Sequence, residues 1–397
     1  MTNETRRRIP RHPAHRPPPS PLPGCSSKLW LDFPSVRVRG RFVGLRSRFR
    51  FNALAAALGL GLAAGHAAPE LELTKFVFEK AEMGVPFRVS LYAADEATAR
   101  RAADAAFARI AELNGVMSDY DSDAELSRLS RTSGQGRAVR VGDALWKVLV
   151  RAQEFSARSE GAFDITVGPL VNVWRRARRK QELPAPELLA GMMARVGFKK
   201  LRLDPARQTA ELLAPEMRLD LGAIAKGFAC DEALAVLRQR GFPRALVGGS
   251  GDMAAGDAPP GEPGWRIEVA ALDAPGAPPS QIVFLKNCAI ATSGDVFQRV
   301  EIAGRRYSHI VDPRTGLGLT DHSLVTVIAP DGMTADALST TVSVLGPEQG
   351  LKLVEETPGT AAQVVRKPGE RIEFLESARW RNVPKAGGTP TQQPTTR

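Results

Sequence analysis

Hydrophobic and polar positions repeat with two different periods along this chain, and each period predicts one kind of element. Residues 87–93, FRVSLYA, place apolar side chains at every second position, which is typical of a strand with one buried face. Residues 96–117 instead repeat small and apolar side chains every three or four positions. That spacing predicts a long amphipathic helix directly after the strand.

Strand-like and helix-like stretches continue to alternate after this first pair. A turn at residues 220–223 leads into a helix that is expected to stop at Gly241. Residues 175–187, RRARRKQELPAPE, are polar and predict a solvated insertion. Further strands are expected at residues 244–249, 265–272, 281–294 and 324–330, a hairpin within 300–312, and helices at 334–346 and 347–356. This mixture predicts an α+β fold in one continuous domain, not a doubly wound parallel sheet.

The net charge of +11 is concentrated at the N-terminus of the 397-residue chain. Residues 1–50 hold 12 Lys and Arg against 2 Asp and Glu, so the rest of the chain is nearly neutral. A basic surface for nucleic acid is therefore not expected in the folded part, and we expect no nucleic-acid partner. At the other end, the composition of residues 384–397, PKAGGTPTQQPTTR, predicts a disordered tail.

The N-terminal region has the pattern of an export signal. A basic cluster, RSRFR, precedes residues 51–65, an uncharged apolar run that is too short to span a bilayer as a mature helix. Small residues before Ala68 offer a cleavage site, so residues 46–67 are predicted to be a cleaved signal peptide. The Pro- and Arg-rich leader, residues 1–50, is unusual ahead of a signal, and translation that begins nearer Val43 would explain it.

Several familiar catalytic patterns are absent from the sequence. Beyond the predicted signal there are two histidines, His309 and His322, and no H-E-x-x-H or other zinc spacing. There is no G-x-S-x-G motif either. Zinc-dependent proteolysis and serine esterase chemistry are therefore disfavoured. Cys230 and Cys288 match no disulfide framework and are expected to be small core residues.

The helix start DLGAIAKG, residues 220–227, is a candidate anion-binding site. Free N–H groups at a helix N-terminus favour a phosphate, and Lys226 could reach an anionic ligand. Asp220 could accept a hydrogen bond from a heterocycle or a ribose. The segment matches neither the P-loop nor the dinucleotide glycine pattern. Glycine-rich helix starts are also common without any ligand.

A second candidate site lies in TADALSTT, residues 334–341, where Thr334 is expected to cap a helix. Asp336 and Thr340 are four residues apart and therefore share one face of that helix. A carboxylate and a hydroxyl together suit Mg²⁺, which prefers oxygen ligands. Compensation of the helix dipole by Asp336 is the alternative interpretation.

Other polar clusters follow predicted strands. Tyr307, His309 and Asp312 lie beside a Pro-Arg-Thr-Gly turn, residues 291–294 end a strand in small hydroxyl residues, and Asp252 follows a glycine-rich bend. Each cluster alone is consistent with an ordinary loop.

Taken together and in order, seven segments resemble the ApbE family, the FAD:protein FMN transferases once described as thiamine-biosynthesis lipoproteins. The resemblance covers roughly residues 75–375. The segments are MSDYD (117–121), GAFDITVGPLVNVW (161–174), DLGAIAKGFACD (220–231), GGSGDM (248–253), ATSGD (291–295), YSHIVDPRTG (307–316) and MTADALSTTVSVLG (333–346).

The resemblance implies a periplasmic, Mg²⁺-dependent enzyme with a single α/β roll-like domain of the α+β class. Such an enzyme splits FAD, joins FMN through its phosphate to a Thr or Ser hydroxyl of a partner protein, and releases AMP. The implied partner belongs to a respiratory or flavin-shuttling system and carries an Asp-x-x-[Ser/Thr]-Gly-Ala-Thr-like motif. Association with the inner membrane stays open.

The resemblance also assigns roles to individual residues. The implied FAD contacts are Met83, Tyr120, Ala162, Phe163, Asp164, Asp220 and Lys226, together with Thr292 and Ile310 from the later segments. Asp336 and Thr340 are implied as the side-chain ligands of Mg²⁺, with the backbone of Ala223 completing the site. His309 is implied as the acceptor of the hydroxyl proton.

Two alternatives to transfer remain at this stage: an FAD pyrophosphatase, and a non-catalytic periplasmic flavin-binding protein. Tyr120 favours transfer, and the pair of Asp336 and Thr340 argues against a carrier. The chain departs from the family in three places. Residues 175–180, RRARRK, are more basic than is usual in the family; they could meet an acidic partner surface, but a solvated loop is favoured. The usual Gly-Gly before Ile is Gly222-Ala223, and the bend at 248–252 lacks the family's asparagine, so any side-chain contact of that asparagine is lost.

Overall fold

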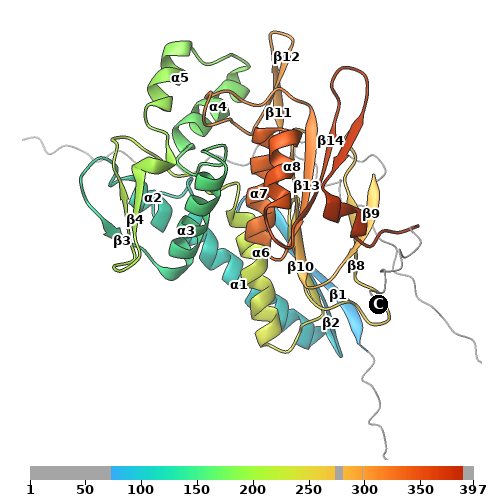
Figure 1. The fold of residues 1–397 in the computed structure, drawn as a ribbon. Coiled ribbons are helices and arrows are strands. Elements are labelled where there is room, and N and C mark those ends of the chain that lie inside the picture. The colour runs from blue at the N-terminus through green and yellow to red at the C-terminus, as the bar shows by residue number, and fades with distance from the viewer. Residues whose placement is uncertain (1–72, 273–279, 297, 388–397) are drawn as a thin grey trace, which may run out of the picture. The chain divides into compact units, whose positions relative to one another are not determined.

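A computed structural model describes residues 73–272, 280–296 and 298–387, and an antiparallel sheet of eight strands runs through them (Figure 1). The order is β1-β2-β6-β7-β10-β13-β14-β15, and every neighbouring pair is antiparallel. The strands are β1 (Thr74–Glu82), β2 (Val85–Ala93), β6 (Ala245–Gly249), β7 (Asp252–Ala255), β10 (Cys288–Gly294), β13 (Ser323–Ala329), β14 (Ala361–Arg366) and β15 (Glu373–Glu376).

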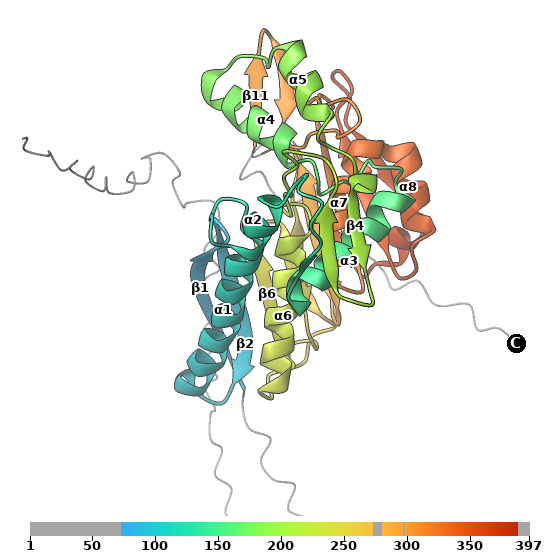
Figure 2. The same ribbon diagram turned by 90° about the vertical axis from the view of Figure 1, so that its left-hand side faces the viewer.

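Three helices cover one face of this sheet side by side (Figure 2). Helix α1 (Glu96–Met117) packs on β1 and β2, α6 (Ala225–Gln239) packs on β6 and β7, and α7 (Gly332–Leu345) packs on β10 and β13. Helix α8 (Pro347–Glu355) continues from α7 and packs on β14. Alternate strand residues face these helices, as the period of two requires. The main core therefore lies between this helical layer and the sheet.

The opposite face of the sheet is covered by the hairpin of β8 (Trp265–Val269) and β9 (Gln281–Leu285) and by the short helix η2 (Ala378–Asn382). Trp265 and Trp380 are buried there. The backbones of Pro384 and Ala386 then hydrogen-bond to β9. The prediction of disorder from residue 384 was therefore wrong for the first residues of the tail.

The remaining elements extend from the helical side of the sheet. They are α2 (Glu125–Ser130), α3 (Asp143–Arg158), α4 (Gly168–Lys180), α5 (Pro186–Met193), η1 (Phe198–Lys200), a small sheet of β3 (Val139–Arg140), β5 (Thr209–Leu212) and β4 (Leu201–Asp204), and the hairpin of β11 (Arg299–Ile302) and β12 (Arg305–Ser308). The rings of Trp174 and Tyr307, 5.2 Å apart between centroids, join α4 to this hairpin.

The α+β class is confirmed, and three local predictions need correction. The stretch 281–294 forms two strands, because Asn287 has a positive φ of 51° and interrupts the extended backbone. Residues 175–180 are not a solvated insertion but the last turns of α4, where Trp174 and Ala177 are buried. Thr334 is not the cap of α7, because Asp331 accepts the hydrogen bond from the Thr334 backbone N–H at 2.7 Å.

The predicted leader (1–50) and signal peptide (46–67) lie outside the described residues, as does the tail from residue 388. None of the helices that the structure describes is long and apolar enough to cross a membrane.

Candidate active site

Helices α6 and α7 touch through glycine at their first turns. A Cβ atom on Gly227 would lie only 2.0 Å from the carbonyl oxygen of Gly332, so no other residue fits there without a shift of backbone. Asp231 of α6 accepts hydrogen bonds from the backbone N–H groups of Gly332 (2.7 Å) and Met333 (3.0 Å). One helix therefore caps the other, and the two helix starts are held side by side.

This crossing brings together what we term the lysine–carboxylate cluster, Lys226, Asp252 and Asp336. Lys226 Nζ lies 3.0 Å from Asp252 Oδ2 and 3.4 Å from Asp336 Oδ2. The Gly227 backbone N–H also donates to Asp336 Oδ2, at 3.1 Å. Both carboxylates are almost fully buried. Two carboxyl groups therefore share one ammonium group inside the protein.

Burial and the second carboxylate shape the ionisation of this cluster. Burial and the neighbouring Asp336 raise the pKa of Asp252 above its ordinary range, against the opposing effect of Lys226. Burial alone would lower the pKa of Lys226, but its two carboxylate partners outweigh burial and raise it. Lys226 is therefore expected to be charged near neutral pH.

Hydroxyl groups adjoin the cluster at the end of β10. Ser293 Oγ lies 3.2 Å from Thr340 Oγ1 and 2.7 Å from Ser339 Oγ, so the strand end contacts the second and third turns of α7. Asp336 lies one turn before Thr340. Among the described residues, no three His, Cys, Asp or Glu side chains gather as a metal site. A cation here would therefore depend on hydroxyl and carbonyl oxygens as well as on a carboxylate.

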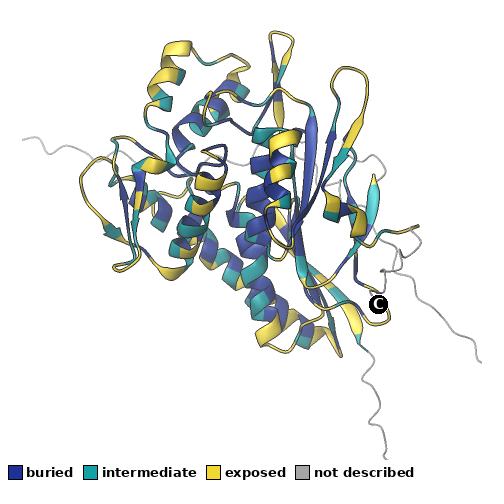
Figure 3. Cartoon of the chain, viewed as in Figure 1, coloured by how far each residue is buried: buried dark blue, intermediate teal, exposed yellow. Residues whose placement is uncertain are grey.

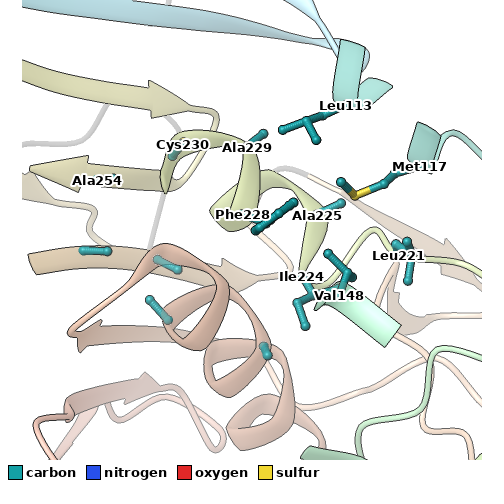
Figure 4. Packing of buried hydrophobic residues seen from close by; sticks show 14 of the residues in the cluster. Leu113, Met117, Val148, Leu221, Ile224, Ala225, Phe228, Ala229, Cys230 and Ala254 are labelled. Carbon is teal, nitrogen blue, oxygen red and sulfur yellow. The ribbon is translucent and has the colours of Figure 1, made fainter. Parts of the chain in front are cut away.

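The turn before α6 is anchored in the main core. Leu221 and Ile224 point among Leu113, Met117 and Val148 of neighbouring helices, and all of these side chains are buried (Figure 4). The Gly222 carbonyl accepts a hydrogen bond from Lys226 Nζ at 3.0 Å. The predicted backbone ligand Ala223 follows Gly222 in this fixed turn.

A second group, which we term the Arg175 clamp, adjoins the turn. Arg175 of α4 is bonded to Asp119 Oδ2 at 2.5 Å and to Asp220 Oδ2 at 3.0 Å. Its guanidinium also lies 4.3 Å from the ring centroid of Tyr120. Asp220 Oδ1 accepts from the Gly222 N–H at 2.8 Å. The guanidinium of Arg175 therefore contacts two of the predicted FAD contacts, Tyr120 and Asp220.

Arg175 is absent from the residues that the sequence singled out, because it stands in the stretch that was read as a solvated insertion. The signal that could have found it is helix periodicity: Trp174 and Ala177 continue the buried side of α4 through this basic stretch. Burial and the adjacent Asp119 raise the pKa of Asp220, and Arg175 opposes that rise.

The segment 162–167 runs beside the stretch that leads to Asp220. The Asp220 N–H donates to the Ile165 carbonyl at 2.8 Å, and Val167 forms an isolated bridge with Arg218. Asp164 is buried, and Thr166 donates to it through both its N–H and its hydroxyl. Burial raises the pKa of Asp164.

The other predicted FAD contacts from this part of the chain are placed as follows. Phe163 belongs to the main core. Ala162 packs with Ile310 and Val344 in a small apolar cluster. Two of the predicted residues, Ala162 and Ile310, are therefore brought into one cluster although they lie far apart in the sequence.

His309 directly follows β12. Its backbone N–H donates to the Gln298 carbonyl at 3.0 Å, and its ring Nδ1 lies 3.1 Å from the same oxygen. A protonated Nδ1 can donate to that carbonyl and leave Nε2 free to accept a proton. Burial and the positive charges of Arg178 and Lys226 lower the pKa of His309 to about 4, against the opposing effect of Asp295. The imidazole is therefore neutral near pH 7.

Two further predicted contacts lie at the same end of the large sheet. Met83 stands in the β1–β2 turn with a positive φ of 50°. Thr292 lies near the end of β10, where its N–H donates to the Gly251 carbonyl at 3.0 Å. The β6–β7 turn that contains Gly251 leads directly to Asp252. The sequence indicated Asp252 only as part of an ordinary bend. The structure adds Asp252 to the site.

We expect Arg175→Met to destabilise the protein and to weaken FAD binding. The change leaves Asp119 and Asp220 without their shared cation, and the loss of one partner from a buried ion pair costs about 3 kcal/mol. Urea unfolding measures the stability, and fluorescence titration with FAD measures the affinity. Arg175→Lys should restore only part of both, because an ammonium cannot bond to two carboxylates in the fork geometry. Arg176→Met, on the exposed side of α4, is the matched control, and an equal loss in this variant would contradict the clamp.

Comparison with known proteins finds one family, and its match spans the segments that carry these groups. The sequence model of the ApbE family matches residues 83–364, which include every predicted site residue from Met83 to Thr340. The "FAD:protein FMN transferase" of Haemophilus influenzae is 33% identical over 289 residues, covering 71% of this chain and 83% of that protein. The protein of the same name from Klebsiella pneumoniae is 32% identical over 315 residues, covering 78% and 89%.

Solved structures agree with the sequence relatives. The flavin transferase ApbE from Vibrio cholerae superposes with a TM-score of 0.69 at 29% identity, covering 78% of this chain and 99% of that one. The Pseudomonas stutzeri flavinyl transferase ApbE, in its apo form, gives a TM-score of 0.68 at 29% identity, covering 78% and 96%.

Proposed function

This chain belongs to the ApbE family, and from that premise we propose that it transfers FMN from FAD to a hydroxyl group of a target protein. The observation that carries the proposal is the lysine–carboxylate cluster. Lys226, Asp252 and Asp336 meet at the starts of two helices, inside the matched segment. Helix N-termini and a fixed ammonium group favour the binding of a pyrophosphate, which FAD carries.

We propose that Asp336, Thr340 and the backbone carbonyl of Ala223 hold Mg²⁺. These donors fit the ion, because Mg²⁺ prefers carboxylate, hydroxyl and carbonyl oxygens. Two buried carboxyl groups, Asp252 and Asp336, also face the single ammonium group of Lys226, which leaves room for a second cation beside them. When bound, Mg²⁺ supplies positive charge that offsets the charge developing on the pyrophosphate.

The remaining proposed FAD contacts surround this cluster. Tyr120, held by Arg175, offers one ring face to a flat ring of FAD. Asp164 and Asp220 lie on neighbouring segments and can accept hydrogen bonds from the donor groups of a ring or a ribose. Met83 and Thr292 lie at the same end of the sheet.

His309 is the proposed acceptor of the hydroxyl proton. The hydroxyl oxygen of the target attacks the phosphorus of the FMN half of FAD, and a new P–O bond forms. The bond from this phosphorus to the bridging oxygen breaks, and AMP leaves with that oxygen. The hydroxyl proton passes to the free Nε2 of His309, which is neutral before the reaction.

The pH dependence of the reaction tests this role. The ratio of the wild-type rate to the His309→Gln rate is expected to be about a hundredfold or more and constant from pH 8 to about 5. It should fall as pH approaches 4, where the imidazole gains its proton and can no longer accept another. The ratio cancels titrations that both proteins share. A ratio that already falls near pH 6.5 would mean that burial, Arg178 and Lys226 do not lower the pKa of His309.

The transfer itself is tested with the mature chain, FAD, Mg²⁺ and a peptide that carries the Asp-x-x-Thr-Gly-Ala-Thr motif. Intact-mass spectrometry should find the peptide plus one FMN, together with one AMP for each peptide modified. Free FMN and AMP beside an unmodified peptide would instead support an FAD pyrophosphatase. Tightly bound and unchanged FAD would support a flavin-binding protein without turnover.

We also propose that the protein is exported to the periplasm by the signal peptide at residues 46–67. The basic and apolar pattern of that segment supports the proposal. N-terminal sequencing of protein from the periplasmic fraction should find Ala68 as the first residue. A cytoplasmic protein that retains residues 46–67 would contradict it.

A further inference from the structure

Helix α4 presents a basic surface next to the candidate active site. We define the α4 arginine face as Arg175, Arg176, Arg178, Arg179 and the adjacent Arg218. An open hollow of about 420 Å³ lies on this face and is lined by four of these arginines together with Asp119, Tyr120 and Asn172. Arg218 also donates to the backbone carbonyl of Asp119, which fixes one wall of the hollow.

Most of the positive charge on this face has no acidic partner. The one acidic side chain that lines the hollow, Asp119, is already bonded to Arg175. Arg176 and Arg179 are exposed, and within the described residues neither forms an ion pair. Among the residues that the structure describes, Arg178 hydrogen-bonds with its side chain to the amide oxygen of Gln298 alone, at 3.4 Å. Burial and the like charges of Arg175 and Arg179 lower the pKa of Arg178, as expected where positive charges are crowded.

The α4 arginine face adjoins both the proposed proton acceptor, His309, and a proposed FAD contact, Tyr120. Gln298, which Arg178 contacts, is also the residue whose carbonyl holds His309. On its other side, the face includes Arg175 and contacts Tyr120. A chain that presents its hydroxyl to His309 therefore comes near Gln298 and Arg178.

The openness of the surface favours a macromolecule over FAD as the occupant. Arg176 and Arg179 point from an exposed helix side, where a partner's backbone and side chains can reach them. The charge of the FAD phosphates is already met, in the proposed function, by Mg²⁺ at Asp336 and Thr340. The charge is also local, since the chain beyond residue 50 is nearly neutral overall. Such a patch orients and attracts a partner of opposite charge.

We propose that the α4 arginine face docks an acidic segment of the acceptor protein, next to the hydroxyl that receives FMN. This inference rests on the proposed function. An extended chain advances about 3.3 Å per residue, so acidic side chains three to six residues from the hydroxyl lie about 10–20 Å away. Those side chains would meet Arg178 first, and then Arg176 and Arg179.

Two fluorescein-labelled peptides test the proposal. Both carry the Asp-x-x-Thr-Gly-Ala-Thr motif, one with glutamates on either side and the other with glutamines at the same positions. Fluorescence anisotropy measures their binding to the mature protein in the presence of FAD and Mg²⁺. The acidic peptide is expected to bind about tenfold more tightly at low salt, and the difference should shrink at about 0.5 M NaCl. Equal affinities for the two peptides would overturn the proposal.

Charge reversal locates the effect on the protein. R176E/R179E should abolish the preference for the acidic peptide, because both side chains are exposed and take part in no ion pair within the described structure. R140E/R240E makes the same change of charge at exposed positions on β3 and at the end of α6, and it should retain the preference. A preference that survives R176E/R179E would overturn the docking face.

Intact-mass spectrometry on the same mixtures separates this inference from the proposed function. An FMN adduct that forms equally well in wild type and R176E/R179E, with equal binding, supports the transfer but contradicts the docking face. Arginine-dependent binding without an adduct on either peptide supports the docking face and contradicts the transfer.

Discussion

Asp336→Ala is expected to abolish FMN transfer, with the rate of AMP release lowered about a thousandfold or more. Asp336 is 2% exposed and accepts from both Lys226 and the Gly227 N–H. It is also the only carboxylate in the proposed Mg²⁺ ligand set. Its loss removes the charge that holds the cation, and removal of a metal or an equivalent charge from a phosphoryl-transfer site costs several kcal/mol in the transition state. Chromatographic measurement of AMP, with mass spectrometry of the acceptor peptide, gives both rates.

A conservative variant separates charge from shape at this position. Asp336→Asn keeps an oxygen that can accept from the Gly227 N–H, so it should fold like the wild type but transfer FMN at only a small fraction of the wild-type rate. Its dependence on Mg²⁺ should shift to higher concentration. Urea unfolding of both variants checks that the loss is not a loss of fold. If Asp336→Asn transferred FMN at the wild-type rate with an unchanged Mg²⁺ dependence, Asp336 would not be a ligand of the ion.

FAD affinity of the same variants distinguishes an enzyme from a carrier. Tyr120, Asp164 and Asp220 belong to other segments and remain in place, so FAD should still bind to Asp336→Ala without Mg²⁺. A protein whose only role is to hold flavin would lose nothing measurable in this variant. A large fall in rate with retained binding is the signature expected of a catalytic site.

The sequence predicted best the elements that have one buried face. Helix α1 repeats its buried residues on one stripe, and its predicted range, 96–117, is the range observed. Helix α7 differs, because most of its side chains are buried on all sides, Asp336 included (Figure 3). The sequence correctly predicted a helix here, but its period of 3.6 does not show that the face of Asp336 is buried as well. Strands β1 and β15, at the edges of the sheet, were missed because none of their side chains is fully buried and the alternation is weak.

The site was predicted in part, for a different reason. Lys226 and Asp336 are 110 residues apart, and no local pattern indicates that they meet. The resemblance to a family placed both in one site, whereas periodicity alone placed each at the start of a separate helix. Asp252 and Arg175 were missed because their roles come from contacts with these distant residues. A polar side chain reveals such a role only when its neighbours in space are known.

Gly227→Ala is expected to lower the free energy of unfolding by about 3 kcal/mol, which is the opposite sign from an ordinary helix substitution. In an open helix position, alanine stabilises relative to glycine by about 0.5–1 kcal/mol. At Gly227 the new Cβ would lie 2.0 Å from the Gly332 carbonyl oxygen and 2.9 Å from Asp336 Cβ. A Cβ on Gly332 would in turn meet the Gly227 carbonyl at 2.5 Å, so neither helix can move without separating the two starts.

Gly115→Ala on α1 is the matched control, because no heavy atom beyond the adjoining helix backbone lies within 4 Å of the position that its Cβ would take. This variant should be as stable as the wild type or slightly more stable, and it should transfer FMN at the wild-type rate. Gly227→Ala should lose activity together with stability, because separation of α6 from α7 draws Lys226 away from Asp336. Urea unfolding measures the free energy of unfolding of both variants and of the wild type. Equal stabilities would show that the helices do not meet at these glycines, and the geometry of the lysine–carboxylate cluster would then have no structural basis.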